Sequence, residues 1–269
     1  MKKGFLTNKY TLSVFILLAV LATDIYLHKG MSRVMLPESF TDKRAPQPGL
    51  QPCNQQLNTT GKRWIKAVNS IKLAAAVDSL ASGIEIDVYF DSVAGQLYAY
   101  HDSAAVERTL LTDILQHFKD RGKAMPVWLD FKNLSTINSN PALESLLALR
   151  NQFSLHNKLI VESSVPQLLR PFCENNFYTS YYVPLFNPYT ATEEELTRQV
   201  DFIASALKLY PVTALSGYYF QTPFLKRFFP AFPVLTWIDD AKMSLVTNLF
   251  NRQLERDTSI FIVLHNADL

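Results

Sequence analysis

The sequence predicts an α/β fold, a (β/α)8 TIM barrel preceded by an N-terminal hydrophobic segment. Two observations favour it. From residue 64 onward, short apolar runs typical of buried strands alternate with runs of helical periodicity, and eight strands can be assigned. Polar side chains also cluster at the ends of these strands, where such barrels carry their active sites. The alternative, an open doubly wound sheet, usually has a glycine-rich phosphate loop, and this sequence contains no GxGxxG motif.

Composition limits the classes of protein that remain. The chain has 269 residues, of which 48% are hydrophobic, enough for one sizeable core. The formal net charge of +2 gives no indication of a nucleic-acid partner. No CxxC or HExxH motif occurs, which argues against a structural zinc site and a zincin protease. Two cysteines, Cys53 and Cys173, are too few for a disulfide framework, and whether they pair in an oxidising compartment stays open.

Residues 1–28 are predicted to be a secretory signal or a membrane anchor. The basic stretch MKKGFLTNKY leads into the apolar run Tyr10–Leu27, which is about long enough to span a bilayer. A signal peptide would be cleaved before Thr23, whereas an anchor, which we favour, would keep Asp24 near the far interface. Both interpretations expect the remainder on the non-cytoplasmic side, although basic residues on both flanks leave the charge rule undecided. The basic flank makes a buried domain helix the least favoured interpretation.

Residues 29–61 are predicted to be a linker, because they are rich in Pro and Gln and show no periodicity. Residues 62–269 are predicted to form the barrel. Its expected strands are Arg63–Val68, Ile84–Phe90, Pro126–Phe131, Lys158–Val161, Thr179–Val183, Thr213–Tyr218, Val234–Ile238 and Ser259–Leu264. A further strand, Gln96–Tyr100, is expected to follow the second one as a hairpin or an extension.

Helices are expected between these strands. Asn140 and Pro141 suit a helix start, Gly122 suits a helix end, and Thr192 with Glu195 forms a capping box. Pro171 is expected to distort its helix. The expected helices cover residues 71–82, 111–121, 142–153, 167–176, 222–229 and 241–257, with one more beginning at the capping box. No helix follows the last strand, so residues 30–60, a membrane or a partner is expected to cover the outside of the first and last strands.

The stretch GIEIDVYF, residues 83–90, is the strongest functional signal. Its apolar residues share one face of the predicted strand, so Glu85 and Asp87 point together to the other. Asp130 and Lys132 share one face at the end of the next barrel strand. Three carboxylates on adjacent strands suit a hard divalent cation such as Mg²⁺, and the lysine suits an anionic ligand oxygen.

Further polar residues fall at strand ends and complete a candidate site. A histidine can transfer a proton near neutral pH, so a cation, a lysine and a histidine together describe a phosphate-ester site. The residues at these ends are Lys66, Asn69, His101, Asp102, Glu162, Trp237, Asp239, Asp240, His265 and Asn266. Each taken alone also suits a turn, a helix cap, a solvated strand end or the core, and their shared location is what indicates a site.

Residues 64–102, from WIKAVNS to YAYHD, resemble the start of the PLC-like phosphodiesterase superfamily. That group includes glycerophosphodiester phosphodiesterases, sphingomyelinase D-type phospholipases and the menorin family. VWLDFK is similar to its third-strand motif, TWIDD to its strand-seven Trp motif, and Asn266 falls near its strand-eight Asn. The similarity is good over residues 64–132 and rests on short ordered motifs beyond them.

The resemblance implies roles for these residues. Glu85, Asp87 and Asp130 would be Mg²⁺ ligands, and Lys132 would hold the phosphate. His101 would be one of two catalytic histidines. Trp237 and Asp240 would shape the pocket, and Asn69 and Asn266 are assigned to substrate binding. The reaction would cleave a phosphodiester, commonly in a lysophospholipid or glycerophosphodiester, and often by attack of a substrate hydroxyl that gives a cyclic phosphate.

Lys66 departs from the resemblance, because the family's first histidine would occupy its position. An ammonium can stabilise phosphate charge or donate a proton, but it is a poor base unless its pKa is lowered. His265 is a candidate substitute, since the last strand neighbours the first in a closed barrel; a surface histidine is the other interpretation.

Three functions follow from the sequence. The first is a membrane-anchored or secreted Mg²⁺-dependent phosphodiesterase whose partners are a phospholipid-derived substrate and the membrane. The second is a catalytically impaired barrel that serves as an extracytoplasmic binding or adhesion module, as Lys66 suggests. The third, a glycoside hydrolase, is less favoured because an adjacent pair of acids with a lysine suits a metal better than an acid and base on opposite sides of a sugar.

Overall fold

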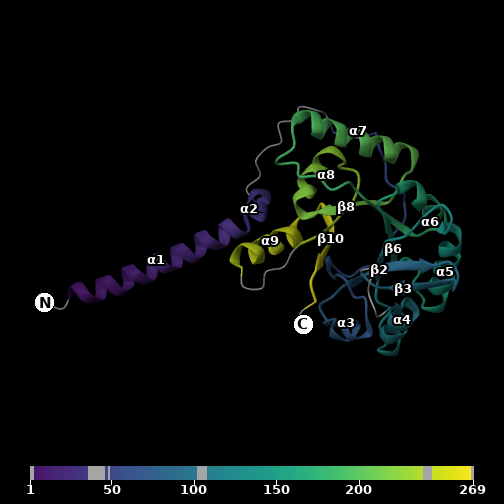
Figure 1. The fold of residues 1–269 in the computed structure, drawn as a ribbon, viewed down its shortest axis with the longest axis horizontal. Coiled ribbons are helices and arrows are strands. Elements are labelled where there is room, and N and C mark those ends of the chain that lie inside the picture. Colours follow the sequence, from purple (N-terminus) through teal and green to yellow (C-terminus); the bar gives the residue numbers. More distant parts are fainter. Residues whose placement is uncertain (1–2, 36–45, 48, 102–107, 239–243, 268–269) are drawn as a thin grey trace.

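The structure is a computed structural model of the chain, and it describes residues 3–35, 46–47, 49–101, 108–238 and 244–267. Within these residues, eight parallel strands follow one another around a closed sheet, as predicted (Figure 1). The first, β1, pairs with both the last strand and the next one, which closes the barrel. The barrel strands are β1 (Arg63–Ile65), β2 (Gly83–Asp91), β5 (Val127–Phe131), β6 (Leu159–Ser163), β7 (Tyr178–Tyr182), β8 (Ala214–Tyr218), β9 (Val234–Trp237) and β10 (Ile260–His265).

Large side chains fill the inside of the barrel. Trp64 and Trp128 are almost fully buried there and pack with Ile160, Tyr178 and other inward residues. Gly83 starts β2 directly against the Trp64 ring, where an added Cβ would lie 2.4 Å from ring atoms. The barrel is therefore a packed core, and open space for a ligand is confined to its ends.

Helices surround the barrel and bury the outward faces of its strands. They are α3 (Ile71–Ala76), α4 (Leu111–Asp120), α5 (Ser139–Gln152), α6 (Arg170–Glu174), α7 (Glu193–Leu209), α8 (Thr222–Phe228) and α9 (Leu245–Arg256). The predicted capping box is present at the start of α7, where the Thr192 and Glu195 side chains each accept the other residue's backbone N–H.

Two helices are shorter than predicted. The first, expected to reach residue 82, ends at Ala76, because the Asp78 carboxylate accepts the N–H groups of Leu80 and Ala81 and forms a turn. The second is divided into a 3₁₀ turn, Pro166–Leu169, and the short α6. Pro171 lies in the first turn of α6, where its missing N–H removes no helical hydrogen bond.

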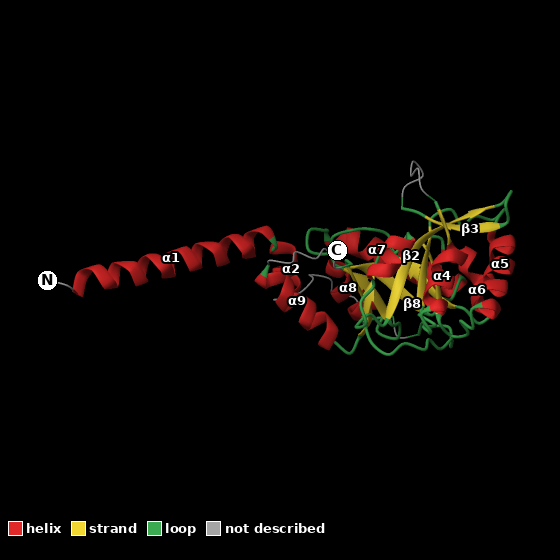
Figure 2. Cartoon of the chain, turned by 90° about the horizontal axis from the view of Figure 1, so that it is seen from below, coloured by secondary structure: helices red, strands yellow, loops and turns green. Residues whose placement is uncertain are grey.

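The additional strand predicted after β2 is present. β3 (Gln96–Ala99) runs antiparallel to β2, and β4 (Thr109–Leu110) runs antiparallel to β3. The turn between β2 and β3 is stabilised by Asp91, which accepts two backbone N–H groups, and by Gly95 at a φ of 66°. β3 lies at the end of the barrel where β2 ends (Figure 2), and His101 follows β3 in the chain.

Residues 49–61, which we call the floor segment, lie against the barrel although they were predicted to belong to a linker. Cys53 donates its N–H to the Val212 carbonyl at 2.8 Å, and Asn58 donates to the Asn157 carbonyl at 2.6 Å. Both carbonyls belong to residues just before barrel strands, at the N-terminal end of the barrel. The floor segment therefore crosses this end, and the candidate site residues lie at the opposite, C-terminal end of the strands. Leu57 packs against the residues that fill the barrel.

The outside of the first and last strands is buried. Ile65 on β1 and Val263 on β10 belong to the main core, and each is at most 1% exposed. Helix α9 packs against β10. Helix α9 thus makes the contact on β10, and the floor segment, which lies within the residues 30–60 expected to supply part of the cover, crosses the end of the barrel.

The N-terminus forms α1 (Lys3–Leu27) and α2 (Lys29–Met35). In α1, Tyr10–Leu27 is long and apolar enough to cross a membrane, with a mean hydropathy of 1.9, and none of it is buried. The helix projects away from the barrel (Figure 1). Its last turn nevertheless contacts α9, because the Asp24 carboxylate accepts the Val246 N–H at 3.0 Å.

Candidate active site

The three predicted acidic residues meet at the C-terminal ends of two adjacent strands. Asp87 on β2 lies in register with Asp130 on β5, and Glu85 is two residues earlier on the same face as Asp87. One carboxylate oxygen from each residue lies within 4.8 Å of the others. The sequence prediction that these side chains converge is confirmed.

The loop after β1 holds two of these acids in place. Ala67 has a φ of 57°, which turns its N–H toward Glu85 and gives a 2.6 Å hydrogen bond to Oε2. The Asn69 amide donates to Asp87 Oδ2 at 2.6 Å, and its oxygen accepts the Asp87 N–H at 2.9 Å. Asn69, assigned from sequence to substrate binding, therefore orients an acidic residue in this structure.

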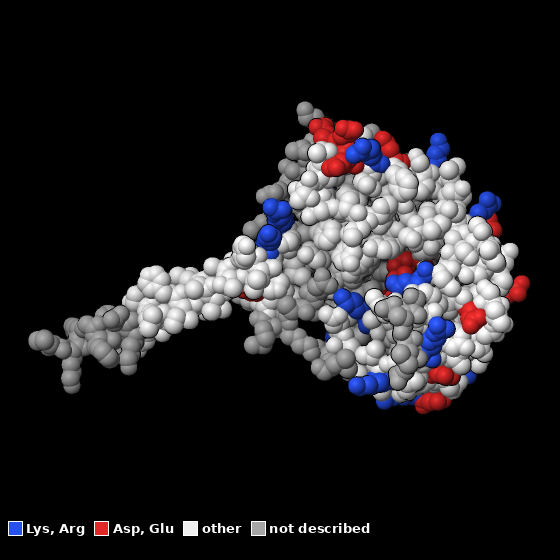
Figure 3. Space-filling view, viewed as in Figure 1, with Lys and Arg blue, Asp and Glu red and all other residues white. Residues whose placement is uncertain are grey.

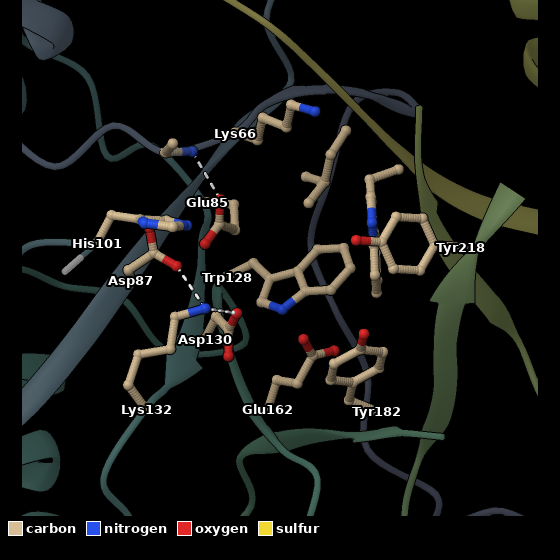
Figure 4. A pocket seen from close by; sticks show the side chains of 13 residues that line it. Lys66, Glu85, Asp87, His101, Trp128, Asp130, Lys132, Glu162, Tyr182 and Tyr218 are labelled. Carbon is tan, nitrogen blue, oxygen red and sulfur yellow. Dashed lines mark hydrogen bonds and ion pairs between the residues drawn. The ribbon is translucent and has the colours of Figure 1, made fainter. Parts of the chain in front are cut away.

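Lys132 is the cation beside the acids (Figure 4). Its Nζ lies 2.6 Å from Asp87 Oδ1 and also forms an ion pair with Asp130. Burial favours the neutral amine, but the carboxylates of Asp130 and Asp87 outweigh it and raise the pKa of Lys132. Lys132 therefore stays protonated at neutral pH.

The acidic residues outnumber the cations that face them. Burial, followed by the charges of Asp87 and Asp130, raises the pKa of Glu85 well above its usual range. Burial also raises the pKa of Asp130 in spite of the adjacent Lys132. Crowded carboxylates of this kind are stabilised by a divalent cation, which prefers oxygen ligands. The donor set therefore fits a divalent metal ion.

Glu162 extends the acidic group onto β6, in register with Asp130. It is 2% exposed and accepts a hydrogen bond from the Ser216 hydroxyl. Burial, with a further contribution from the charge of Asp130, raises the pKa of Glu162 to about 8. Its carboxyl group is thus mostly protonated at neutral pH and can donate a hydrogen bond.

These residues line a cavity of about 300 Å³ at the mouth of the barrel. Figure 3 shows acidic and basic atoms together in a hollow on the face of the barrel. One side is aromatic: the Trp237 ring lies 4.8 Å from the Tyr218 ring and 5.1 Å from the Tyr182 ring, between centroids. The cavity therefore combines a charged side with an apolar wall.

Lys66 and His101 line the same cavity, as predicted. Lys66 donates from Nζ to the Ile238 carbonyl at 2.8 Å, and in Figure 4 its ammonium points away from the carboxylates. His101 lies on the other side, beside Asp87 (Figure 4). The two residues that the resemblance pairs thus flank the acidic group from opposite sides.

Other predicted residues lie elsewhere. His265, the candidate substitute for the missing histidine, points out of the barrel, and its Nε2 lies 3.6 Å from Glu255 on α9. Side chains alternate along β10, and the preceding Leu264 is the one that lines the cavity, so the proposed substitution by His265 is wrong.

Asn266 is exposed and is not among the described cavity residues. Asp102, Asp239 and Asp240 lie outside the described residues.

The sequence interpretation missed Tyr182 and Tyr218. Both lie at the C-terminal ends of barrel strands, within the stretches YYVP and SGYYF. Their position at strand ends could have marked them as candidate site residues, but aromatic residues at such positions more often pack in a core. Only the closed barrel shows that they pack beside Trp237 in one wall of the cavity.

Comparison with known proteins gives matches in structure. No known family profile and no curated protein sequence matches the chain. A protein from Silicibacter pomeroyi, assigned as a glycerophosphoryl diester phosphodiesterase, matches with a TM-score of 0.56 at 14% identity, over 80% of this chain and 92% of its own. A glycerophosphodiester phosphodiesterase from Parabacteroides distasonis matches with a TM-score of 0.51 at 15% identity, over 77% and 93%.

The chain has the fold of the glycerophosphodiester phosphodiesterases. These structures belong to the superfamily that the sequence resembles. At identities near 15%, the likeness concerns the fold, and the chemistry of this chain is argued from its own residues.

Proposed function

We propose that this protein is a Mg²⁺-dependent phosphodiesterase that cleaves a glycerophosphodiester or a lysophospholipid. The observation that carries the proposal is the group of Glu85, Asp87 and Asp130, with Lys132 beside it, at the mouth of the barrel. The fold shared with glycerophosphodiester phosphodiesterases supports the same reaction class.

The three carboxylates would hold the cation, which when bound supplies positive charge to the phosphate and stabilises the charge that develops during cleavage. Lys132 binds a phosphate oxygen through its ammonium group and orients the phosphorus atom in the cavity. Asn69 and the Ala67 N–H keep Asp87 and Glu85 in their positions while the substrate binds.

His101 and Lys66 transfer protons in this proposal. His101 accepts the proton of the attacking hydroxyl, because a neutral imidazole ring has one nitrogen that can act as a general base. Lys66 donates a proton toward the leaving oxygen, since an ammonium carries a proton to give and no lone pair. To do so, Lys66 Nζ either breaks its hydrogen bond to the Ile238 carbonyl or donates to that carbonyl and to the leaving oxygen at the same time.

The aromatic wall binds the apolar part of the substrate. Trp237, Tyr218 and Tyr182 present ring surface opposite the charged residues, and both tyrosines carry a hydroxyl that can contact a head group. On the strength of the resemblance, we keep Asp240 and Asn266 as substrate-binding candidates.

We further propose that α1 anchors the protein in a membrane, with the barrel on the non-cytoplasmic side. The helix is apolar and unburied along Tyr10–Leu27, and Asp24 fastens its end to the barrel. Residues 1–28 would then be the anchor, 29–61 the connection and 62–269 the phosphodiesterase domain.

A binding module is the second candidate. Lys66 favours it, because the lysine replaces the expected histidine and its Nζ is engaged by a backbone carbonyl. A protein of this kind would bind a phosphodiester and the cation without turning the substrate over.

Turnover of glycerophosphocholine and lysophosphatidylcholine, with Mg²⁺ or with a chelator, tests the proposal. Asp87→Asn should lower the rate roughly 100-fold or more, because metal catalysis contributes several kcal/mol. Asp113→Asn is a matched control, since Asp113 is exposed on α4 and does not line the cavity. If the wild-type protein binds Mg²⁺ and both substrates without cleaving either, it is a binding module.

A further inference from the structure

The two cysteines of the chain meet beneath the barrel. Cys53 lies in the floor segment, where its N–H is bonded to the Val212 carbonyl. Cys173 lies in α6, on a different part of the chain. Gln55, two residues after Cys53 in the floor segment, contacts Cys173 directly.

Gln55 fixes the floor segment against Cys173. Its Nε2 donates to the Cys173 carbonyl at 3.0 Å, and the Cys173 thiol lies 3.7 Å from its Oε1. The same Oε1 accepts a hydrogen bond from the buried Thr213 hydroxyl at 3.1 Å. These contacts hold the segment in one position beside α6, at the level of Cys173.

The two thiols lie close enough to shift each other's pKa, which is raised for Cys53 and lowered for Cys173. Both are half-buried, so they are held by the fold and can still be reached by a small oxidant. The sequence contains 2 cysteines, so neither has an alternative partner within the chain.

We propose that Cys53 and Cys173 form an intramolecular disulfide that locks the floor segment to the barrel in an oxidising compartment. The inference is independent of the proposed reaction, because the cysteines lie at the opposite end of the barrel from the acidic residues. It agrees with the expected export of the chain, since disulfides persist in extracytoplasmic compartments.

The reaction is thiol–disulfide exchange with a disulfide oxidant, such as oxidised glutathione or an oxidoreductase. The hydrogen bond from Cys53 lowers the pKa of the Cys173 thiol, which favours Cys173 as the first nucleophile. Its thiolate attacks the oxidant and releases one thiol, giving a mixed disulfide. The Cys53 sulfur then loses its proton and attacks the Cys173 sulfur, which releases the second thiol. Two electrons and two protons pass to the oxidant.

The crosslink would close a loop of about 120 residues, which stabilises the fold chiefly by restricting the unfolded chain. The loop contains β1, β2, β5 and β6, so the crosslink restrains half of the barrel strands. A disulfide of this kind typically changes the melting temperature of a domain of this size by about 5–15 °C.

The test uses the full-length protein in detergent, equilibrated in a glutathione buffer as oxidising as a secretory compartment. Thiols are counted with a maleimide after denaturation, and the crosslinked peptides that carry Cys53 and Cys173 are identified by mass spectrometry. We expect no free thiol, a monomer on a non-reducing gel, and a melting temperature that falls by about 5–15 °C on reduction. The variant Cys53→Ser/Cys173→Ser should melt at one temperature with and without reductant.

Two free thiols at equilibrium in this buffer, or a disulfide between two copies of the chain, would overturn the proposal. An intramolecular disulfide whose reduction leaves the melting temperature unchanged would overturn the locking role. Because the thiol count is made on the wild-type protein, the test holds even if the serine variant fails to fold.

Discussion

Ala67 shows how one residue prepares the site. A positive φ is uncommon for a residue with a side chain, and Ala67 adopts 57°. The conformation brings its N–H to Glu85 Oε2, and the Val68 N–H then bonds to the Glu85 carbonyl. A buried carboxylate thus receives a fixed donor. Local backbone strain of this kind is concentrated at functional sites, which agrees with a role for Glu85.

The position of Lys66 gives the most direct test of catalysis. Lys66→Ala should lower phosphodiester turnover by about 10²-fold or more, since general acid–base groups typically contribute 10²–10⁴-fold. Lys66→His should keep or raise the rate, because imidazole can both accept and donate a proton near neutral pH. Initial rates with both substrates and Mg²⁺ measure the effect. Lys72→Ala, which changes an exposed lysine on α3, is the control.

Activity of Lys66→His in a protein whose wild type is inactive would identify a pseudoenzyme with an otherwise intact site. An unchanged rate in Lys66→Ala would show that the lysine has no part in proton transfer and only bonds to the Ile238 carbonyl.

Glu162 should make the stability of the metal-free protein depend on pH. Its pKa is raised from about 4.5 to about 8, so the folded protein keeps a proton that the unfolded chain releases. The free energy of unfolding should therefore fall as pH rises from 4.5 to 8, by at most about 1.4 kcal/mol per pH unit from this group, and level off above 8. Urea unfolding in chelator at several pH values measures this slope.

Glu162→Gln should make the free energy of unfolding fall less steeply with pH, because glutamine is neutral throughout the range. Its side-chain oxygen can still accept the Ser216 hydrogen bond. Glu85 and Asp130, whose pKa values are also raised, would retain the remainder. A slope identical in wild type and variant would refute the assignment to Glu162.

At the scale of elements, α2 connects the apolar helix to the barrel. Met31 and Val34 are 3% and 7% exposed, and α2 packs on α9 and on the turn Tyr219–Gln221. Gly30 contributes to this contact, since an added Cβ would lie 2.8 Å from the Tyr219 hydroxyl. α2 is therefore held against the barrel by side-chain packing, which fixes the direction in which α1 leaves the barrel.

Met31→Ala tests this packing. Removing a buried methionine side chain should lower the free energy of unfolding by roughly 2–4 kcal/mol, because burial is lost and a cavity remains. Arg33→Ala, an exposed change on the same helix, should have little effect. Denaturant unfolding in detergent measures both variants. Equal stability of the two would mean that α2 is only a tether.

At the scale of the whole molecule, the acidic group couples cation binding to folding. A cation that binds only the folded barrel stabilises it by about 2.7 kcal/mol at a concentration 100 times its dissociation constant. For a domain of this size, Mg²⁺ should then raise the melting temperature by about 5–10 °C over protein in chelator. Differential scanning calorimetry measures the change, and titration with Ca²⁺ compares the two cations.

The double variant Asp87→Asn/Asp130→Asn separates specific binding from general ion effects. It should melt at the same temperature with and without Mg²⁺, because two of the three converging carboxylates are gone. A wild-type protein that does not respond to either cation would contradict the metal site.

The barrel and much of the site could be predicted from local patterns in the chain. Alternation of strand and helix patterns is local, so each barrel strand could be predicted within a few residues, and the extra strand Gln96–Tyr100 as well. The convergence of Glu85, Asp87 and Asp130 also followed from sequence, because parallel strands bring their C-terminal ends to one edge.

Closure of the barrel, by contrast, determines which side chains line the cavity together. The tyrosines Tyr182 and Tyr218 belong to different strands from Trp237, and His265 points outward because the register of β10 puts Leu264 inside. The floor segment and the meeting of Cys53 with Cys173 depend on contacts between residues about a hundred positions apart or more. Such contacts leave no periodic pattern in the chain, since they are set by closure of the barrel and not by local preference.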